Sequence, residues 1–218
     1  MKETKEKPFT VLAVSGSEHP SGTTADVLNH AEKILADRGA VLDVVHLGQA
    51  RVTPCGPCGD CNVRLLPCAV DDDVAAIVQR MIAADGILYA APVHGFGTAA
   101  LMQSFIERAG VGHLRFTRPL ANKVAGVIVT GRRYSHTEVY SHLVKNALLN
   151  RMILVGSGMP PIVYSDEVEQ GDTEGLDMVR SMLDRMVDMI RLLREHRALT
   201  GRDGLSPQTL NERQRAGA

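Results

Sequence analysis

The sequence predicts an α/β domain built on a parallel β-sheet. Short apolar runs, typical of strands buried on both faces, alternate along the chain with segments whose apolar residues recur at helical spacing. Five such runs and five such segments follow one another, with no repeat or linker between them. We therefore expect a single domain over residues 1–199, which contains a cysteine-bearing loop at 54–70, and a polar C-terminal tail over 200–218.

The predicted strands cover 9–14, 41–47, 86–91, 123–130 and an interrupted pair at 152–155 and 161–164. Pro92 is expected to stop the third strand. The first helix is expected to begin with Thr23 or Thr24 as its cap, and Ser135 with Glu138 has capping-box spacing ahead of another. Asp71–Asp73 supply negative charge at a helix start, and the last helix runs to about His196.

Composition excludes several classes of function. The chain has 218 residues, 44% of them hydrophobic and 22% charged, and its net charge is −1. Binding to a nucleic-acid backbone requires an excess of positive charge that is lacking here. The longest apolar runs, such as VAGVIV, are too short to span a bilayer, and the charged start MKETKEKP is no secretory signal. We expect a cytoplasmic protein that binds neither membranes nor nucleic acid.

The loop after the first strand has the composition of a phosphate site. It reads SGSEHPSGTT from Ser15 to Thr24 and leads directly into a helix. Backbone N–H groups at a helix start suit a phosphate, and the hydroxyl groups of the loop can donate to its oxygens. The loop lacks both G-x-G-x-x-G and G-K-[ST], so a phosphate monoester fits better than a diphosphate. The alternative is a polar connection that binds nothing.

All four cysteines lie in one window, PCGPCGDCNVRLLPC, with the spacing C-x2-C-x2-C-x6-C. Bacterial ferredoxins use the same triplet for three corners of a [4Fe–4S] cluster, whereas zinc sites more often have two pairs with a longer spacer. The ligands of such a centre would be Cys55, Cys58, Cys61 and Cys68. A cluster, structural zinc and free or redox-active thiols are the three interpretations of this window.

The first loop resembles the FMN-phosphate loop of the flavodoxin-like NAD(P)H-dependent FMN reductases, whose usual pattern is G-S-x-R followed by small residues. The stretch ADGILYAAPVHGFGTAALMQSFIERAG resembles the second signature of that family, a strand ending in S-P-V-Y and a helix ending in F-I-D-R. The resemblance covers about residues 9–195. It implies a flavodoxin-like fold with a five-stranded parallel sheet of order 2-1-3-4-5 and helices on both faces.

The resemblance also implies the residues that bind FMN, in three loops. They are Ser15, Ser17, His19, Gly22, Thr23 and Thr24 for the phosphate, Pro92, Val93, His94, Gly95, Phe96 and Gly97 against the flavin ring, and Thr130, Gly131 and Arg132 after the fourth strand. Two residues depart from the family pattern. His19 stands where arginine is frequent, and His94 stands where tyrosine is common. His94 either packs on the flavin or donates a proton near its reactive nitrogen as a catalytic residue; otherwise it is a loop histidine with a hydrogen bond to make.

The cysteine window, in such a fold and after the second strand, resembles the iron–sulfur flavoproteins, a branch of the same family. This resemblance implies an oxidoreductase that passes electrons between ferredoxin or NAD(P)H, a [4Fe–4S] cluster, FMN and a small acceptor, working as a homodimer or homotetramer. Two alternatives remain. One is a cluster-free NAD(P)H-dependent FMN or quinone reductase whose cysteines hold zinc, and the other is a non-catalytic electron carrier of the flavodoxin kind.

Overall fold

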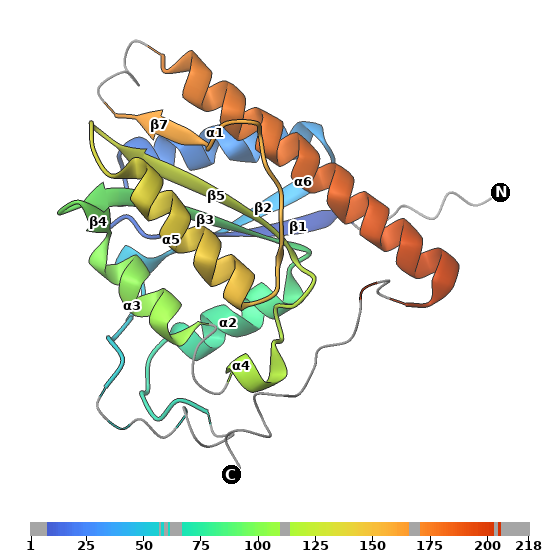
Figure 1. Cartoon of the computed structure of the whole chain (residues 1–218), viewed down its shortest axis with the longest axis horizontal. Helices are drawn as coiled ribbons and strands as arrows, with labels where there is room; N and C mark the ends of the chain where they lie inside the picture. The colour runs from blue at the N-terminus through green and yellow to red at the C-terminus, as the bar shows by residue number, and fades with distance from the viewer. Residues whose placement is uncertain are drawn as a thin grey trace.

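The computed structural model describes residues 8–56, 58, 61, 67–109, 114–165, 171–202 and 205. A central sheet lies between two layers of helices, and the long helix α6 crosses one face (Figure 1). The strands are β1 (Phe9–Ser15), β2 (Ala40–His46), β3 (Gly86–His94), β4 (Gly97–Thr98), β5 (Val124–Gly131), β6 (Ile153–Leu154) and β7 (Ile162–Tyr164). The helices are α1 (Thr23–Asp37), η1 (Leu47–Gln49), α2 (Val74–Ala83), α3 (Ala100–Arg108), α4 (Leu114–Thr117), α5 (His136–Leu149) and α6 (Thr173–Thr200).

The order of strands confirms the predicted flavodoxin-like α/β fold. The sheet runs β2-β1-β3-β5-β6, and its main strands are parallel. Both β6 and β7 pair in parallel with β5, at its start and at its end, so the fifth strand is interrupted as the sequence predicts. The short β4 is an addition, because it pairs antiparallel with the end of β3.

Both faces of the sheet are covered by helices. Successive residues of a strand point to opposite faces, so Leu12 and Val14 pack in one core while Val11 and Ala13 pack in the other. Apolar residues of α2, α3 and α5 complete the first core, and those of α1 and α6 complete the second. Among the described residues, no helix has the length and the apolar character needed to cross a bilayer.

Three local expectations are wrong: the end of β3, the cap of α5 and the cap of α1. The strand β3 does not stop at Pro92, because Pro92 pairs with Thr130 of β5. Since β1 ends opposite Ala90, Pro92 has no strand on its β1 side, and a residue without an N–H group is tolerated there. Ser135 takes a left-handed conformation with φ 59° and makes no capping bond.

The cap of α1 also differs. Gly22, not Thr23 or Thr24, is the N-cap residue, and its φ of 146° favours glycine. The side chains of both threonines are therefore available for contacts other than capping. The predicted tail falls largely on residues 203, 204 and 206–218, which lie outside the described residues.

Candidate flavin and cysteine site

The three predicted flavin loops open at one edge of the sheet. The end of β1 pairs with β3 at Ser15 and Ala90, and β3 pairs with β5 at Pro92 and Thr130. Since these strands are parallel, the segments that follow them leave the sheet on the same side. The end of β2 lies at this edge too, because Ser15 also pairs with His46. The segment with the cysteines therefore starts beside the flavin loops.

Ser15 carries a buried hydroxyl group at the start of the first loop. The residue is 1% exposed, and its Oγ has no hydrogen-bond partner among the described residues. Burying a hydroxyl group without a partner is unfavourable, so this atom fits a site for an external acceptor. The next residue, Gly16, donates from its N–H to Ala90 O at 2.8 Å, and a Cβ on it would lie 2.6 Å from Met102 Cβ. Gly16 thus lets the loop pass directly over α3.

The remainder of the loop brings the chain to the start of α1, where backbone N–H groups can act as donors. Ser17 Oγ accepts from the N–H of His19 at 3.2 Å, which tightens the turn, while the side chain of His19 is exposed. The N–H groups of the first turn of α1 have no partners within the helix and carry partial positive charge. Together with the hydroxyl groups they suit a phosphate monoester.

A buried hydrogen bond joins the first loop to the third. The hydroxyl groups of Thr24 on α1 and Thr130 at the end of β5 lie 2.8 Å apart, although 106 residues separate them in the chain. Both residues are at most 4% exposed. This bond holds the start of α1 against the end of β5, and so fixes two of the predicted flavin loops relative to each other.

The second loop is a tight hairpin between β3 and β4. His94 pairs with Gly97, and the two residues between them, Gly95 and Phe96, have φ values of 54° and 65°. Positive φ at both positions is the geometry of a type I′ turn. Phe96 is 72% exposed in this strained conformation, and its ring lies 6.2 Å from that of Tyr134, which is 65% exposed. Two exposed aromatic rings thus flank the predicted flavin loops.

The side chain of His94 connects the second loop to the first. Its Nδ1 lies 3.9 Å from Oε2 of Glu18, and both side chains are partly exposed. The contact is an ion pair only when the imidazole is protonated. Glu18 was not predicted as a site residue, because an acidic side chain in a phosphate loop has no favourable role by itself.

Gly131 is enclosed by side chains. A Cβ on this residue would lie 2.9 Å from His136 Nε2 and 3.3 Å from Val93 Cβ. His136 is 5% exposed, its ring packs edge-on against Tyr164 at 4.9 Å, and its Nε2 has no hydrogen-bond partner among the described residues. Sequence reasoning missed Tyr134, His136 and Tyr164, because the rings meet only in the folded chain. Arg132, the third predicted residue of this loop, is exposed.

The cysteine segment is the loop at 54–70. Two aspartates that follow it, Asp72 and Asp73, bind the backbone just before it and so hold its two ends together. Asp73 Oδ2 accepts from the N–H of Arg51 at 2.7 Å, and Asp72 Oδ2 accepts from the N–H of Thr53 at 2.8 Å. Asp72 also accepts from both terminal nitrogens of Arg108, the last residue of α3, which donates to Thr53 O as well. The carboxylates expected to serve a helix start therefore also hold together the two ends of a long loop and attach it to α3.

Asp72 and Arg108 are buried as a pair, with side chains 0% and 4% exposed. Burial alone would raise the pKa of Asp72, but the hydrogen bonds from Arg108, Thr53 N and Val74 N outweigh it and hold that pKa below its usual value. The carboxylate raises the pKa of Arg108, and the thiol of Cys68 contributes in the same direction. Arg108 therefore interacts with a cysteine as well as with the base of its loop.

The four cysteines are free thiols near one another. Cys55 and Cys58 are exposed, and Cys61 and Cys68 are half-buried. Partial burial raises the pKa of Cys55, and the nearby Cys61, Cys68 and Cys58 raise it further. The donor set suits iron or zinc chemically. Within the described residues, however, no group of three or more His, Cys, Asp or Glu is arranged to hold a metal ion.

An open parallel sheet whose switch-point loops offer hydroxyl groups, helix-start N–H groups and exposed aromatic rings defines a flavodoxin-like mononucleotide-binding protein. The unpartnered Oγ of Ser15 suits a phosphate oxygen, and the rings of Phe96 and Tyr134 offer a surface to a planar ring. The family model described as NADPH-dependent FMN reductase matches residues 9–165. The chain belongs to this family and is an FMN-dependent oxidoreductase.

Similar proteins agree with this assignment. An iron-sulfur flavoprotein of Methanocaldococcus jannaschii is 27% identical over 194 residues, which cover 85% of this chain and 99% of the relative. The iron-sulfur flavoprotein of Methanosarcina thermophila is 29% identical over 191 residues, covering 86% and 98%. The crystal structure of RosB with bound 8-demethyl-8-formylriboflavin-5′-phosphate has a TM-score of 0.69 at 14% identity, covering 92% of this chain and 90% of RosB, and shows the shared fold.

Proposed function

We propose that this FMN-dependent oxidoreductase is an iron–sulfur flavoprotein. In this proposal Cys55, Cys58, Cys61 and Cys68 hold a [4Fe–4S] cluster, and electrons pass between a donor, the cluster, FMN and a small acceptor. Ferredoxin and NAD(P)H are the candidate donors. The names of the two archaeal relatives support the cluster.

The attachment of the cysteine segment carries the proposal. Asp72 and Arg108 tie the base of that segment to α3, and α3 follows directly on the hairpin that is predicted to face the flavin ring. A group held by the cysteines would therefore lie on the same edge of the sheet as the flavin loops. This proximity supports transfer of electrons between the two centres.

FMN, when bound, supplies both one-electron and two-electron chemistry. The protein's own residues bind and orient it. Ser15, Ser17 and the N–H groups at the start of α1 would hold the phosphate, and the segment Pro92–Gly97 with Thr130 and Gly131 would hold the ring. His94 lies in the segment predicted against the ring, with its Nδ1 3.9 Å from Oε2 of Glu18, and we place it as the candidate proton donor to the flavin.

The exposed rings of Phe96 and Tyr134 give a planar molecule a surface on which to stack. We infer that a planar acceptor, such as a quinone, or the nicotinamide of NAD(P)H reaches the flavin over this surface. Four free thiols in one loop suit a reducing compartment, so we place the protein in the cytoplasm. We infer a homodimer or homotetramer, as the family resemblance implies.

Anaerobic purification with iron, zinc, acid-labile sulfide and flavin measured per chain tests the proposal. We expect iron and sulfide in equal amounts together with FMN. The variant Cys58→Ala should lose iron and the broad absorbance of the cluster while retaining FMN, because the flavin loops lie on other segments. Bleaching of the flavin by NAD(P)H or by reduced ferredoxin then identifies the donor.

Two results would replace the proposal with an alternative. Zinc without sulfide, even after reconstitution with iron, would make the protein a cluster-free FMN or quinone reductase with a structural metal. The absence of steady-state turnover with either donor and a dye would make it an electron carrier.

A further inference from the structure

Arg108, at the end of α3, lies between the two ends of the cysteine segment. On one side its Nη1 donates to Thr53 O at 3.0 Å, two residues before Cys55. On the other side its Nη1 and Nη2 donate to Oδ2 and Oδ1 of Asp72, four residues after Cys68. The guanidinium therefore lies where the chain enters and leaves the loop that carries all four cysteines.

The bonds to Thr53 and Asp72 occupy only part of the guanidinium. Arginine has five N–H donors in one plane, and these bonds use three of them. The two that are left, on Nε and on Nη2, point in the same direction from one edge of the group and form a fork for a further acceptor. Nε itself is buried and has no hydrogen-bond partner among the residues that the structure describes.

A buried N–H group without an acceptor is unfavourable, and this one is held away from water. The side chain of Arg108 is 4% exposed, and its bonds on both sides prevent it from turning outward. Cys68, which is half-buried, supplies a sulfur atom nearby, because its thiol raises the pKa of Arg108 through a hydrogen bond as well as through charge. The edge of the guanidinium that carries Nε therefore has a cysteine sulfur within its reach.

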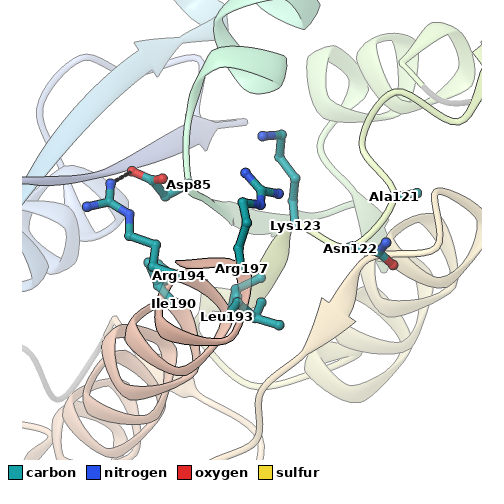
Figure 2. Close-up of a pocket in the computed structure, with 9 residues that line it drawn as sticks. Asp85, Ala121, Asn122, Lys123, Ile190, Leu193, Arg194 and Arg197 are labelled. Carbon is teal, nitrogen blue, oxygen red and sulfur yellow. Dashed lines mark hydrogen bonds and ion pairs between the residues drawn. The ribbon is translucent and has the colours of Figure 1, made fainter. Parts of the chain in front are cut away.

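A second arginine pair has a similar arrangement at the opposite edge of the sheet. Asp85, which precedes β3, accepts from the N–H of Thr10 at 2.9 Å and from Arg194 of α6 at 2.7 Å (Figure 2). Asp72 likewise accepts from a backbone N–H and from an arginine of a helix. Arg194 ties α6 to the start of β3, so it is a control for the purely stabilising part of the role of Arg108.

We propose that Arg108 donates to the sulfur of Cys68 and so positions this cysteine as a ligand of the metal centre. The proposal rests on the proposed function only in that the four cysteines bind a metal, whichever metal it is. A hydrogen bond to a coordinating sulfur fixes the direction of that ligand and stabilises its negative charge. Hydrogen bonds to the sulfurs of a cluster also help to set its reduction potential, so Arg108 would raise that potential.

Titration of the full-length, FMN-loaded protein with Co²⁺, after removal of its metal, tests this role. Absorbance bands from thiolate-to-cobalt charge transfer report the bound sulfurs and require no sulfide. Arg108→Lys keeps a positive charge beside Asp72 but lacks the planar fork, and Arg194→Lys is the matched control. Arg108→Lys is also measured in the Cys68→Ala and Cys55→Ala backgrounds, which separates a contact with one cysteine from an effect on the whole loop.

We expect Arg108→Lys to weaken Co²⁺ binding about tenfold or more in the otherwise wild-type chain and in Cys55→Ala, and to have no effect in Cys68→Ala, where the acceptor is gone. Arg194→Lys should leave Co²⁺ binding unchanged. The proposal is overturned if Arg108→Lys binds Co²⁺ as tightly as wild type, or if it weakens binding equally in both cysteine variants. Should Arg108→Lys fail to fold, Asp72→Asn with Arg108→Met takes its place, because removing both charges leaves no buried ion alone.

The outcome for Arg108 is independent of the outcome for the cluster. Coupling to Cys68 in a protein that contains no acid-labile sulfide would keep this role and remove the iron–sulfur cluster. Iron and sulfide without that coupling would keep the cluster and remove the role of Arg108. In cluster-loaded protein, Arg108→Lys should lower the reduction potential measured by spectroelectrochemical titration, and an unchanged potential would contradict the hydrogen bond to sulfur.

Discussion

Arg108 and Asp72 form a buried ion pair in which both terminal nitrogens of the guanidinium face both oxygens of the carboxylate. The pair joins the last residue of α3 to the base of the cysteine segment, 36 residues earlier in the chain. The attachment of that segment to α3 therefore depends on the carboxylate of Asp72, which makes it open to test by mutation.

Asp72→Ala should destabilise the protein by about 3–5 kcal/mol, because it leaves the buried guanidinium of Arg108 without its counter-charge. Urea unfolding of the FMN-loaded protein measures this change. Asp71→Ala is the control, since the side chain of Asp71 is fully exposed and its loss should change the free energy of unfolding by less than about 0.5 kcal/mol. Equal effects of the two variants would mean that the pair does not hold the loop.

The same carboxylate predicts a dependence of stability on pH. The folded pKa of Asp72 lies below its unfolded value of about 3.9, so its ionised form stabilises the fold above that pH. The contribution is lost as pH falls through the folded pKa. The difference in unfolding free energy between wild type and Asp72→Asn should therefore be constant from about pH 7 to 5 and narrow below about pH 4. A difference that widens in acid contradicts the assignment.

Ser15→Ala should have opposite effects with and without flavin. In FMN-free protein the variant removes a buried hydroxyl group that has no partner among the described residues, so the free energy of unfolding should stay the same or rise by about 1 kcal/mol. In the FMN complex it removes a predicted phosphate donor, and FMN affinity, measured by quenching of flavin fluorescence, should fall about tenfold. Unchanged affinity would show that Ser15 does not contact the phosphate.

Gly131→Ala should cost about 1–3 kcal/mol, because its Cβ would lie 2.9 Å from His136 Nε2. Thermal unfolding measures the loss. Gly156→Ala is the matched control, because a Cβ there would meet nothing within 4 Å. The double variant Gly131→Ala with His136→Ala should recover part of the loss, and no recovery would place the strain against Val93 instead.

Phe96→Gly should separate the backbone strain at this residue from the role of its ring in stacking on an acceptor. Glycine accepts the φ of 65° more readily than phenylalanine but loses more entropy on folding, so stability should change by less than about 1 kcal/mol. If the exposed ring stacks on a planar acceptor, KM for a quinone should rise several-fold in steady-state assays. Leu148→Ala removes a similarly exposed apolar side chain from α5 and should leave KM unchanged. The stacking role is refuted if both variants behave alike.

The sequence predicted the strands because buried strands give local signals, whereas their order came from the resemblance to the flavodoxin-like FMN reductases. Buried strands such as Phe9–Ser15 are continuous apolar runs, and the breaks between them carry glycine, proline and polar residues. The interrupted fifth strand was predictable for the same reason. The prediction that the third strand stops at Pro92 was wrong, because proline stops a strand only where its missing N–H group would face a neighbouring strand.

The contacts within the site were not predictable in the same way. The hydroxyl groups of Thr24 and Thr130 suggested separate roles in the sequence, whereas in the fold they bind each other. Tyr134 and His136 had no pattern around them that marks a site, since their partners Phe96 and Tyr164 come from other segments. The contact of Arg108 with Asp72 was also not predictable, because the resemblance identified Arg108 only as the last residue of a helix motif.

The break between β6 and β7 has a consequence for how molecules of this protein meet. These two short strands form one border of the sheet, with only two and three residues in ladder geometry. Such short edge strands offer a neighbouring chain few unpaired backbone N–H and C=O groups, and this protects against edge-to-edge aggregation into fibrils. Copies of the chain must then associate through helices and loops instead of by lengthening the sheet across this border.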